Sequence, residues 1–363
     1  MSRFERQTIL PGFGQDGQDK LSRSKVLVVG AGGLGCPALL YLAAAGIGTI
    51  GIADGDEVSL SNLNRQVIFG EKDIGKLKAQ AAGELIRSKY SDIQINIIPY
   101  FLHRDNALDI IGEYDLILDG SDNFGTRYLV NDACFILKKA LVFGAIYQHE
   151  GQVAILNVHD RETEPLTYRD LFPNPPLAAE VPNCAETGVL GVLPGIIGTM
   201  QATEAIKLLS GFGKPLIHKV LFYNLKDHGT YELDIKLNPE GRKLMPTSAA
   251  EFKKMDYAVV CGPQDRISWD EAQDMIKEKS ENTILLDVRE VHEMPKLERF
   301  AYTSLPLSGL LNKTQKVDKA ETILVFCQSG VRSQRAVEDL KAAMPAKKIY
   351  SIEGGMNALL QKS

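Results

Sequence analysis

Residues 25–54 read KVLVVGAGGLGCPALLYLAAAGIGTIGIAD, and this stretch decides the fold of the first part of the chain. An apolar run at 25–30 is followed by a glycine-rich turn and an apolar helical stretch, which leads to a second apolar run at 49–54. Short apolar runs bounded by glycine predict buried strands. The order strand, helix, strand is the building unit of a parallel sheet with helices on its faces.

The glycine-rich turn indicates a nucleotide site. It stands between the first strand and its helix, and an aspartate ends the second strand. Glycines allow phosphate to approach the helix N-terminus closely, and the aspartate can accept hydrogen bonds from ribose hydroxyls. On these residues alone, an NAD-dependent dehydrogenase is the commonest interpretation. The predicted nucleotide-binding residues are Gly30, Gly32, Gly33, Gly35 and Asp54.

Further apolar runs continue the alternation of strands and helices. Three more runs follow at 94–100, 114–120 and 140–146, with helical stretches before the first of them, at 76–89, and before the last, at 123–138. Because strands alternate with helices, we predict an α/β fold with a Rossmann-like, doubly wound and mainly parallel sheet. Residues 160–187 are rich in proline and charge and lack a period, which predicts a long functional loop.

The length of 363 residues suits about two or three domains. We predict a first domain at 1–245, a polar linker at 246–262, and a small α/β domain at 263–363. The stretches TILLDVRE (283–290) and TILVFCQSG (322–330) are the predicted buried strands of this second domain.

Composition and charge narrow the classes of partner. The net charge of -5 gives no reason to expect nucleic acid or an anionic membrane surface. Residues 36–53 are uncharged, but their proline and small residues suit a buried helix leading into a strand better than a membrane span. The first residues lack the pattern of a signal peptide, so we expect a cytoplasmic protein. The five cysteines form no CxxC pair; Cys36, Cys134 and Cys261 are expected to be inert.

Charged residues beyond the glycine turn argue for a triphosphate. Arg65 and Gln66 follow the ribose aspartate, Lys78 begins a helix, and Asp119 and Asp122 follow a later strand. Cations can take the phosphate charge, and a carboxylate can hold a magnesium ion. Hydride transfer needs none of these groups. A structural alternative is that Asp122 only caps the following helix.

Four motifs in order, RQTILPGFG (6–14), GAGGLG (30–35), SNLNRQ (61–66) and DGSDN (119–123), resemble the ThiF/MoeB/HesA-type adenylyltransferases, which activate ubiquitin-like proteins. The resemblance covers about residues 1–240 and implies ATP with Mg²⁺. It implies that Asp54 contacts the ribose, Arg65 and Lys78 the phosphates, and Asp122 the magnesium. It also implies a homodimer, because Arg6 matches an arginine that reaches the neighbouring subunit's ATP site. Asp56, Asn64 and Gln66 complete the predicted ATP-binding set.

This sequence departs from that family at a metal site. Bacterial members usually hold zinc with two CxxC pairs, but the first corresponding stretch is TYRD, with Thr167 and Asp170 in place of thiolates. No second pair occurs near LNPEGRK (237–243). Zinc needs about four soft or imidazole ligands, so we expect no structural zinc and a loop held by packing or by the partner subunit. Cys184 lies in the long loop where many relatives carry a conjugating or sulfur-accepting cysteine, and it is a candidate catalytic residue.

The stretch TILVFCQSGVRS (322–333) places Cys327 after a strand, in a loop closed by Arg332. Tyrosine-phosphatase loops have one residue more than the four found here between cysteine and arginine. The loop instead resembles that of rhodanese domains, as do LLDVREVHE (285–293) and IEGGMNAL (352–359). Converging amides and a helix N-terminus favour the thiolate of Cys327 and its persulfide. The alternative is a buried, inert cysteine.

Together the two halves predict an adenylyltransferase with sulfurtransferase activity. ATP would adenylate the C-terminal glycine of a ubiquitin-like sulfur carrier ending in Gly-Gly, and a Cys327 persulfide would attack the acyl adenylate to yield a thiocarboxylate. A cysteine desulfurase is the expected sulfur donor, with Cys184 a candidate for releasing the product. The small subunit of molybdopterin synthase is the first choice of carrier; thiazole-synthesis and tRNA-thiolation carriers are alternatives. The remaining alternatives are the dehydrogenase and a non-catalytic, nucleotide-sensing scaffold.

Overall fold

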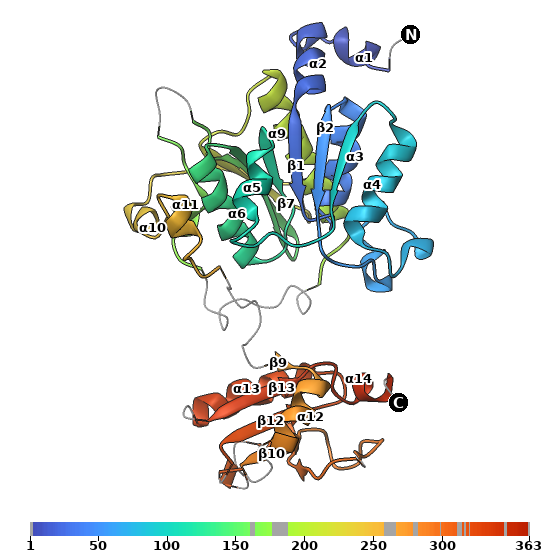
Figure 1. Cartoon of the computed structure of the whole chain (residues 1–363), viewed down its shortest axis with the longest axis vertical. Coiled ribbons are helices and arrows are strands. Elements are labelled where there is room, and N and C mark those ends of the chain that lie inside the picture. Colours follow the sequence, from blue (N-terminus) through green and yellow to red (C-terminus); the bar gives the residue numbers. More distant parts are fainter. Residues whose placement is uncertain are drawn as a thin grey trace. The chain divides into compact units, whose positions relative to one another are not determined.

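The computed structural model describes most of the chain, and the chain divides into two compact units, Met1–Cys261 and Gly262–Ser363 (Figure 1). No helix among the described residues is long and apolar enough to cross a membrane. The described residues are 3–159, 164–175, 188–257, 266–278, 282–297, 299–310, 314–315, 317–318, 320–344 and 347–361.

The first unit is built on an eight-stranded sheet with the order β3-β2-β1-β4-β5-β6-β7-β8. Neighbouring strands are parallel from β3 to β5 and antiparallel from β5 to β8. The predicted mainly parallel sheet is confirmed. Its strands are β1 (Lys25–Val29), β2 (Thr49–Ala53), β3 (Gln94–Ile98), β4 (Leu116–Asp119), β5 (Ala140–Tyr147), β6 (Glu150–Leu156), β7 (Lys219–Asn224) and β8 (Thr230–Asp234).

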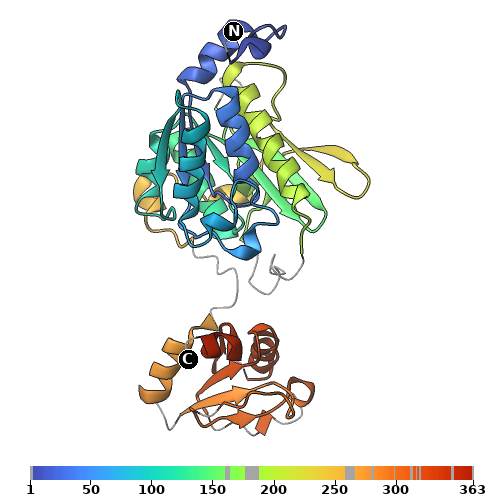
Figure 2. The same ribbon diagram turned by 90° about the vertical axis from the view of Figure 1, so that its right-hand side faces the viewer.

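Helices cover both faces of this sheet, as a doubly wound fold requires (Figures 1 and 2). One face packs against α2 (Gly14–Arg23), α3 (Gly35–Ala45), α4 (Lys78–Lys89) and α9 (Val192–Ser210). The other face packs against α5 (Ala107–Gly112) and α6 (Phe124–Leu137). The shorter helices are α1 (Glu5–Thr8), η1 (Leu60–Asn62), η2 (Glu71–Asp73), α7 (Tyr168–Leu171), α10 (Pro239–Lys243) and α11 (Ala249–Phe252).

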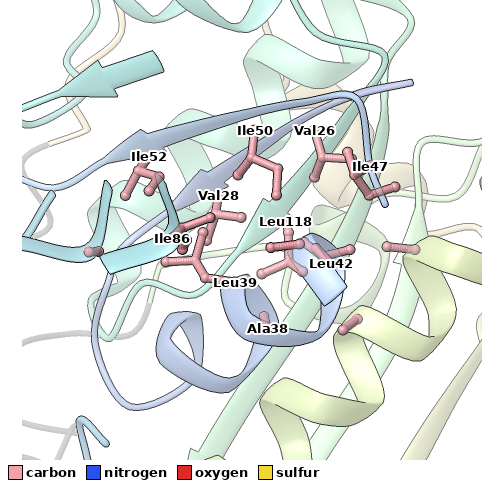
Figure 3. Packing of buried hydrophobic residues seen from close by; sticks show 14 of the residues in the cluster. Val26, Val28, Ala38, Leu39, Leu42, Ile47, Ile50, Ile52, Ile86 and Leu118 are labelled. Atoms are coloured by element: carbon pink, nitrogen blue, oxygen red, sulfur yellow. The ribbon is translucent and has the colours of Figure 1, made fainter. Parts of the chain in front are cut away.

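The central strand β1 contributes to the core on both of its sides. Val26 and Val28 share a buried cluster with Leu39 and Leu42 of α3 (Figure 3), whereas Leu27 belongs to the cluster on the opposite face. Successive side chains of a strand point to opposite faces, so a strand covered on both sides must be apolar throughout. This is why β1 is recognisable in the sequence as an uninterrupted apolar run.

The described part of the expected linker belongs to the first unit. Phe252 of α11 is fully buried in the core on the α6 side of the sheet. The Tyr257 hydroxyl donates to the buried Asp132 carboxylate of α6 at 3.0 Å. The polar composition of residues 249–257 predicts a linker, and two aromatic side chains anchor this stretch to the first unit.

The second unit contains a five-stranded parallel sheet with the order β11-β10-β12-β13-β9. Buried clusters lie on both faces: Cys327 joins the cluster packed on α13, and Trp269 of α12 joins the other. This confirms the predicted small α/β domain. Its elements are β9 (Arg266–Ile267), α12 (Trp269–Glu278), β10 (Thr283–Asp287), β11 (Thr303–Ser304), η3 (Leu307–Gly309), β12 (Thr322–Phe326), α13 (Val331–Ala343), β13 (Lys348–Ile352) and α14 (Gly355–Gln361).

Candidate functional sites

The glycine turn lies where the loops after β1 and β4 meet. Gly30 has a φ of +90°, and a Cβ there would lie 2.8 Å from the carbonyl oxygen of Gly120. A Cβ on Gly35 would lie 1.9 Å from the carbonyl oxygen of Gly30. These positions require glycine because backbone approaches backbone. The close approach brings the DGSDN loop to the turn, at the carboxyl edge of the parallel strands where α/β folds bind ligands.

Asp54 is buried directly beside this turn. Its carboxylate accepts the amide of Ala31 at 2.7 Å and the amide of Asp56 at 2.8 Å. Burial raises the pKa of the Asp54 carboxyl, and the two amide bonds oppose that rise. The carboxylate thus fixes the turn, and each oxygen retains acceptor capacity for a ribose hydroxyl.

Lys78 and Asp56, two predicted ATP contacts, form an ion pair at the start of α4. The Lys78 ammonium nitrogen lies 2.8 Å from the Asp56 carboxylate, and the Lys78 amide donates to the Asp56 carbonyl at 2.8 Å. The Lys78 side chain is 8% exposed and that of Asp56 is 55% exposed. Asp56 therefore holds a buried ammonium group that still has further N–H donors for a phosphate.

Arg65 and Gln66 flank the glycine turn. A Cβ on Gly33 would lie 3.7 Å from Cγ of Arg65, and one on Gly32 would lie 3.8 Å from Nε2 of Gln66. Nη1 of Arg65 donates to the carbonyl of Ser61 and to Oδ1 of Asn64, at 2.9 and 3.1 Å. The buried Oε1 of Gln66 has no partner among the described residues. The structure therefore brings these predicted residues together at the turn.

Asp122 is exposed in the loop that contacts the turn. The α6 cap is Asn123, whose Oδ1 accepts the amide of Thr126 at 2.8 Å, so the capping alternative for Asp122 is wrong. Asp119 is buried beneath the same loop and accepts the amide and hydroxyl of Ser121 at 2.9 and 2.6 Å. Burial raises the pKa of Asp119, and the charge of Arg127 opposes the rise. Asp119 therefore supports the loop, while Asp122 faces solvent.

Arg6 lies away from the glycine turn of its own chain. It is exposed on α1, whose Gln7 donates to the carbonyl of Ala45 at 3.2 Å. Ala45 ends α3, and the glycine turn begins α3. An 11-residue helix is about 16 Å long, so Arg6 and the turn lie at opposite ends of α3.

An ion pair joins the TYRD stretch (167–170) to residues 237–243. Arg242 of α10 donates through Nη2 and Nε to the Asp170 carboxylate of α7, at 2.7 and 3.0 Å. Thr167 completes a capping box by donating its amide and hydroxyl to Asp170 at 2.7 and 2.9 Å. The described residues contain no cluster of three His, Cys, Asp or Glu able to hold a metal ion. The ion pair connects α7 with α10 across 72 residues of the chain.

Replacing Arg242 by alanine should lower the free energy of unfolding by about 3 kcal/mol, because the fully buried Asp170 side chain would lose its charged partner. Lys243→Ala is the matched control, since that lysine makes an exposed pair with Glu240 and should change stability by less than about 0.5 kcal/mol. Thermal denaturation with and without EDTA measures both points. A wild-type melting temperature that falls in EDTA would contradict a metal-free tether.

In the second unit, Cys327 is fully buried at the end of β12. The Gly330 amide donates to its Sγ at 3.1 Å, and α13 begins at the next residue. A Cβ on Gly355 would lie 2.1 Å from the carbonyl oxygen of Cys327, so the predicted glycine pair makes room for the loop. Amide donation and the helix N-terminus favour negative charge on this sulfur. The loop thus has the chemistry needed for a thiolate or persulfide.

Two further cysteines lie in the core of the first unit. Cys36 and Cys134 are fully buried, and burial raises the pKa of the Cys36 thiol to about 12 and that of Cys134 well above its ordinary value. They are therefore poor nucleophiles. Cys184 and Cys261 lie outside the described residues.

Comparison with known proteins agrees with this geometry. Residues 4–242 match the ThiF family, and residues 268–362 match the Rhodanese-like domain. The chain belongs to the ThiF family. The family match decides against the dehydrogenase interpretation of the glycine turn, and it confirms the predicted adenylyltransferase fused to a rhodanese domain.

Two relatives match this ThiF-family chain over nearly its whole length. It is 38% identical, over 99% of its length and 92% of the relative, to the probable adenylyltransferase/sulfurtransferase MoeZ of Mycobacterium tuberculosis. It is 37% identical, over 99% of its length and 86% of the relative, to the adenylyltransferase and sulfurtransferase MOCS3 of Culex quinquefasciatus. The prediction of an enzyme that combines these activities is thereby confirmed.

Two further comparisons concern the first unit. The sulfur carrier protein adenylyltransferase of Thermus thermophilus is 45% identical over 72% of this chain and 97% of that protein. A crystal structure of E. coli MccB with MccA-N7isoASN superposes with a TM-score of 0.58 at 21% identity, covering 66% of this chain and 74% of that one. The latter shows that the fold is shared.

Proposed function

We propose that the first unit adenylates the C-terminal glycine carboxylate of a ubiquitin-fold sulfur carrier. Membership of an ATP-using family assigns ATP as the nucleotide, and the carboxylate would attack its α-phosphorus to expel pyrophosphate. The observation that carries the proposal is the grouping of Arg65, Gln66 and the Asp122 loop around the glycine turn. Arg65 and the ammonium of Lys78 would stabilise the phosphate charge as pyrophosphate leaves.

The residues present fit a magnesium ion delivered with ATP. Asp122 is an exposed carboxylate next to the glycine turn, and magnesium bound to a nucleotide takes most of its ligands from phosphate and water. Bound there, the ion would neutralise phosphate charge. Asp54 would orient the ribose, and Asn64 and Asp56 would hold Arg65 and Lys78 in place.

The far position of Arg6 supports a homodimer as part of this proposal. An arginine at the opposite end of α3 from its own glycine turn can assist adenylation only in a second copy of the chain. Arg6 would then add a cation to the partner's triphosphate, where it could stabilise the leaving pyrophosphate.

The second step would transfer sulfur. The terminal sulfur of a Cys327 persulfide, loaded by a cysteine desulfurase, would attack the acyl carbon of the adenylate, and AMP would leave as an acyl disulfide forms. A thiolate, for which Cys184 is the candidate, would then attack Sγ of Cys327 and release the carrier thiocarboxylate. The disulfide left between the two cysteines would be reduced by an external dithiol. Covalent catalysis of this kind divides a difficult transfer into easier steps.

The first choice of carrier is the small subunit of molybdopterin synthase, because the motifs of the first unit most resemble that branch of the family. ATP–pyrophosphate exchange, measured with purified molybdopterin, thiazole and tRNA-thiolation carriers in turn, tests this choice. We expect exchange with the molybdopterin carrier. Exchange with the thiazole or tRNA-thiolation carrier alone would overturn the assignment, and no exchange with any of them would overturn adenylation of a carrier.

A further inference from the structure

Two arginines contact the Cys327 loop, and each has a carboxylate partner. Arg289 is buried and donates through Nε and Nη2 to the Asp287 carboxylate at 2.8 to 3.2 Å. Arg332 donates through Nη1 and Nη2 to the two oxygens of Glu293 at 2.5 and 2.7 Å. Both cations at the loop are therefore neutralised by carboxylates of the same unit.

The Arg289 pair has a structural function. Its Nη1 donates to the carbonyl of Pro295 at 2.9 Å and to Oε1 of Gln328, inside the loop, at 3.1 Å. Nε2 of Gln328 donates in turn to Asn357 of α14 at 2.7 Å. Arg289 is thus fully engaged in holding the loop. Of the two arginines described at this loop, Arg332 is the one that an anion could bind by displacing its carboxylate partner.

Glu293 is fixed in place independently of Arg332. It lies in a turn after β10, where its amide donates to the Glu290 carbonyl at 3.0 Å and its Oε1 accepts the Glu290 amide at 2.8 Å. The hydrogen bonds from Arg332 lower the pKa of the Glu293 carboxyl to about 2, so it is ionised at neutral pH. The N–H groups of Arg332 that an incoming anion would need are therefore already bound to the negatively charged Glu293.

We propose that Glu293 determines which sulfur donors the Cys327 loop accepts. Because Glu293 accepts the hydrogen bonds of Arg332, it disfavours small dianionic sulfur donors such as thiosulfate. A dianion of this kind must compete with the fixed carboxylate for the same N–H groups. A persulfide presented by a protein or another thiol needs no such cation. This inference rests on the proposed role of Cys327 as the sulfur-carrying nucleophile.

The reaction that reports on this inference is transfer of sulfur from thiosulfate to cyanide. The Cys327 thiolate attacks the outer sulfur of thiosulfate, the sulfur–sulfur bond of thiosulfate breaks, and sulfite leaves with the bonding electrons. Cyanide then attacks the terminal sulfur of the resulting persulfide. Thiocyanate forms and the thiolate returns, so no external oxidant or reductant is needed.

The experiment compares Glu293→Gln with wild type, using the full chain. We expect kcat/KM for thiosulfate to rise about fivefold, mainly through a lower KM, because the freed guanidinium can bind the dianion. Glu290→Gln is the matched control: it removes the same charge from the same turn, but its carboxylate accepts from Ser308. Adding Arg332→Ala to Glu293→Gln should remove the gain.

Two results would overturn the inference: no gain in Glu293→Gln, or an equal gain in Glu290→Gln. Loading from cysteine persulfide, measured as one added sulfur on Cys327 by mass spectrometry, separates this failure from that of the proposed function. If wild type is loaded by cysteine persulfide and Glu293→Gln gains nothing with thiosulfate, the inference about Glu293 alone fails. If neither donor loads Cys327, its role as the sulfur carrier fails as well.

Discussion

Replacing Arg65 by alanine should lower carrier-dependent ATP–pyrophosphate exchange by about 10²–10³-fold. The Arg65 side chain lies against the glycine turn, and Ser61 and Asn64 hold one of its guanidinium nitrogens. Under the proposed function, its other nitrogens would bind phosphate oxygens as charge develops on the leaving group. A fixed cation of this kind lowers the barrier more than it strengthens nucleotide binding.

Arg23→Ala provides the comparison for this variant. Arg23 ends α2 and has an exposed side chain that makes a surface pair with Asp19. Its removal should leave exchange unchanged, because exposed pairs contribute little. Wild-type exchange in Arg65→Ala would contradict the proposed phosphate role of this arginine, because adenylation would then proceed without its charge.

Replacing Cys327 by alanine should reduce thiocarboxylate formation at least about a hundredfold while adenylation persists. The loss is expected because Sγ of Cys327 is the proposed nucleophile. It accepts a hydrogen bond from the Gly330 amide at the start of α13, which favours its thiolate or persulfide. Mass spectrometry of the carrier measures the thiocarboxylate, and pyrophosphate exchange measures adenylation in the same samples. The two readouts separate the two proposed steps.

Cys134→Ala is the matched control for this loss, because Cys134 is an equally buried thiol whose pKa burial raises strongly. Sulfur transfer should survive that change in any variant that remains folded. Undiminished thiocarboxylate formation in Cys327→Ala would favour the alternative in which the rhodanese domain is a non-catalytic scaffold.

Much of the candidate nucleotide site could be predicted because its residues follow local rules. The glycine turn, Asp54 and Lys78 each stand at the end of a strand or the start of a helix, where sequence order fixes their place. In a parallel sheet, such positions collect at one edge. Convergence of the turn with the DGSDN loop therefore follows from topology alone, and the contact of Gly30 with Gly120 bears it out.

Other features could not be predicted, since they depend on neighbours distant in the chain. The first half of β6, Glu150–Gln152, is polar or lacks a side chain, so no apolar run marks it. Pairing with β5, from Tyr147 opposite Glu150 onward, supplies its hydrogen bonds. The polar stretch around α11 likewise joins the first unit through the burial of Phe252.

The sequence by itself determined the strand and helix alternation, the glycine turn and the cysteine loop. These features depend on backbone conformation and apolar burial, which short stretches of residues are enough to predict. Only the tertiary structure decided which charge partners each charged side chain takes. Asp170 and Arg242 are 72 residues apart, and Glu293 and Arg332 are 39 residues apart. Such pairs form only when folding brings two segments to hydrogen-bonding distance. The residue pattern within one segment therefore does not predict which residue of the other segment becomes its partner.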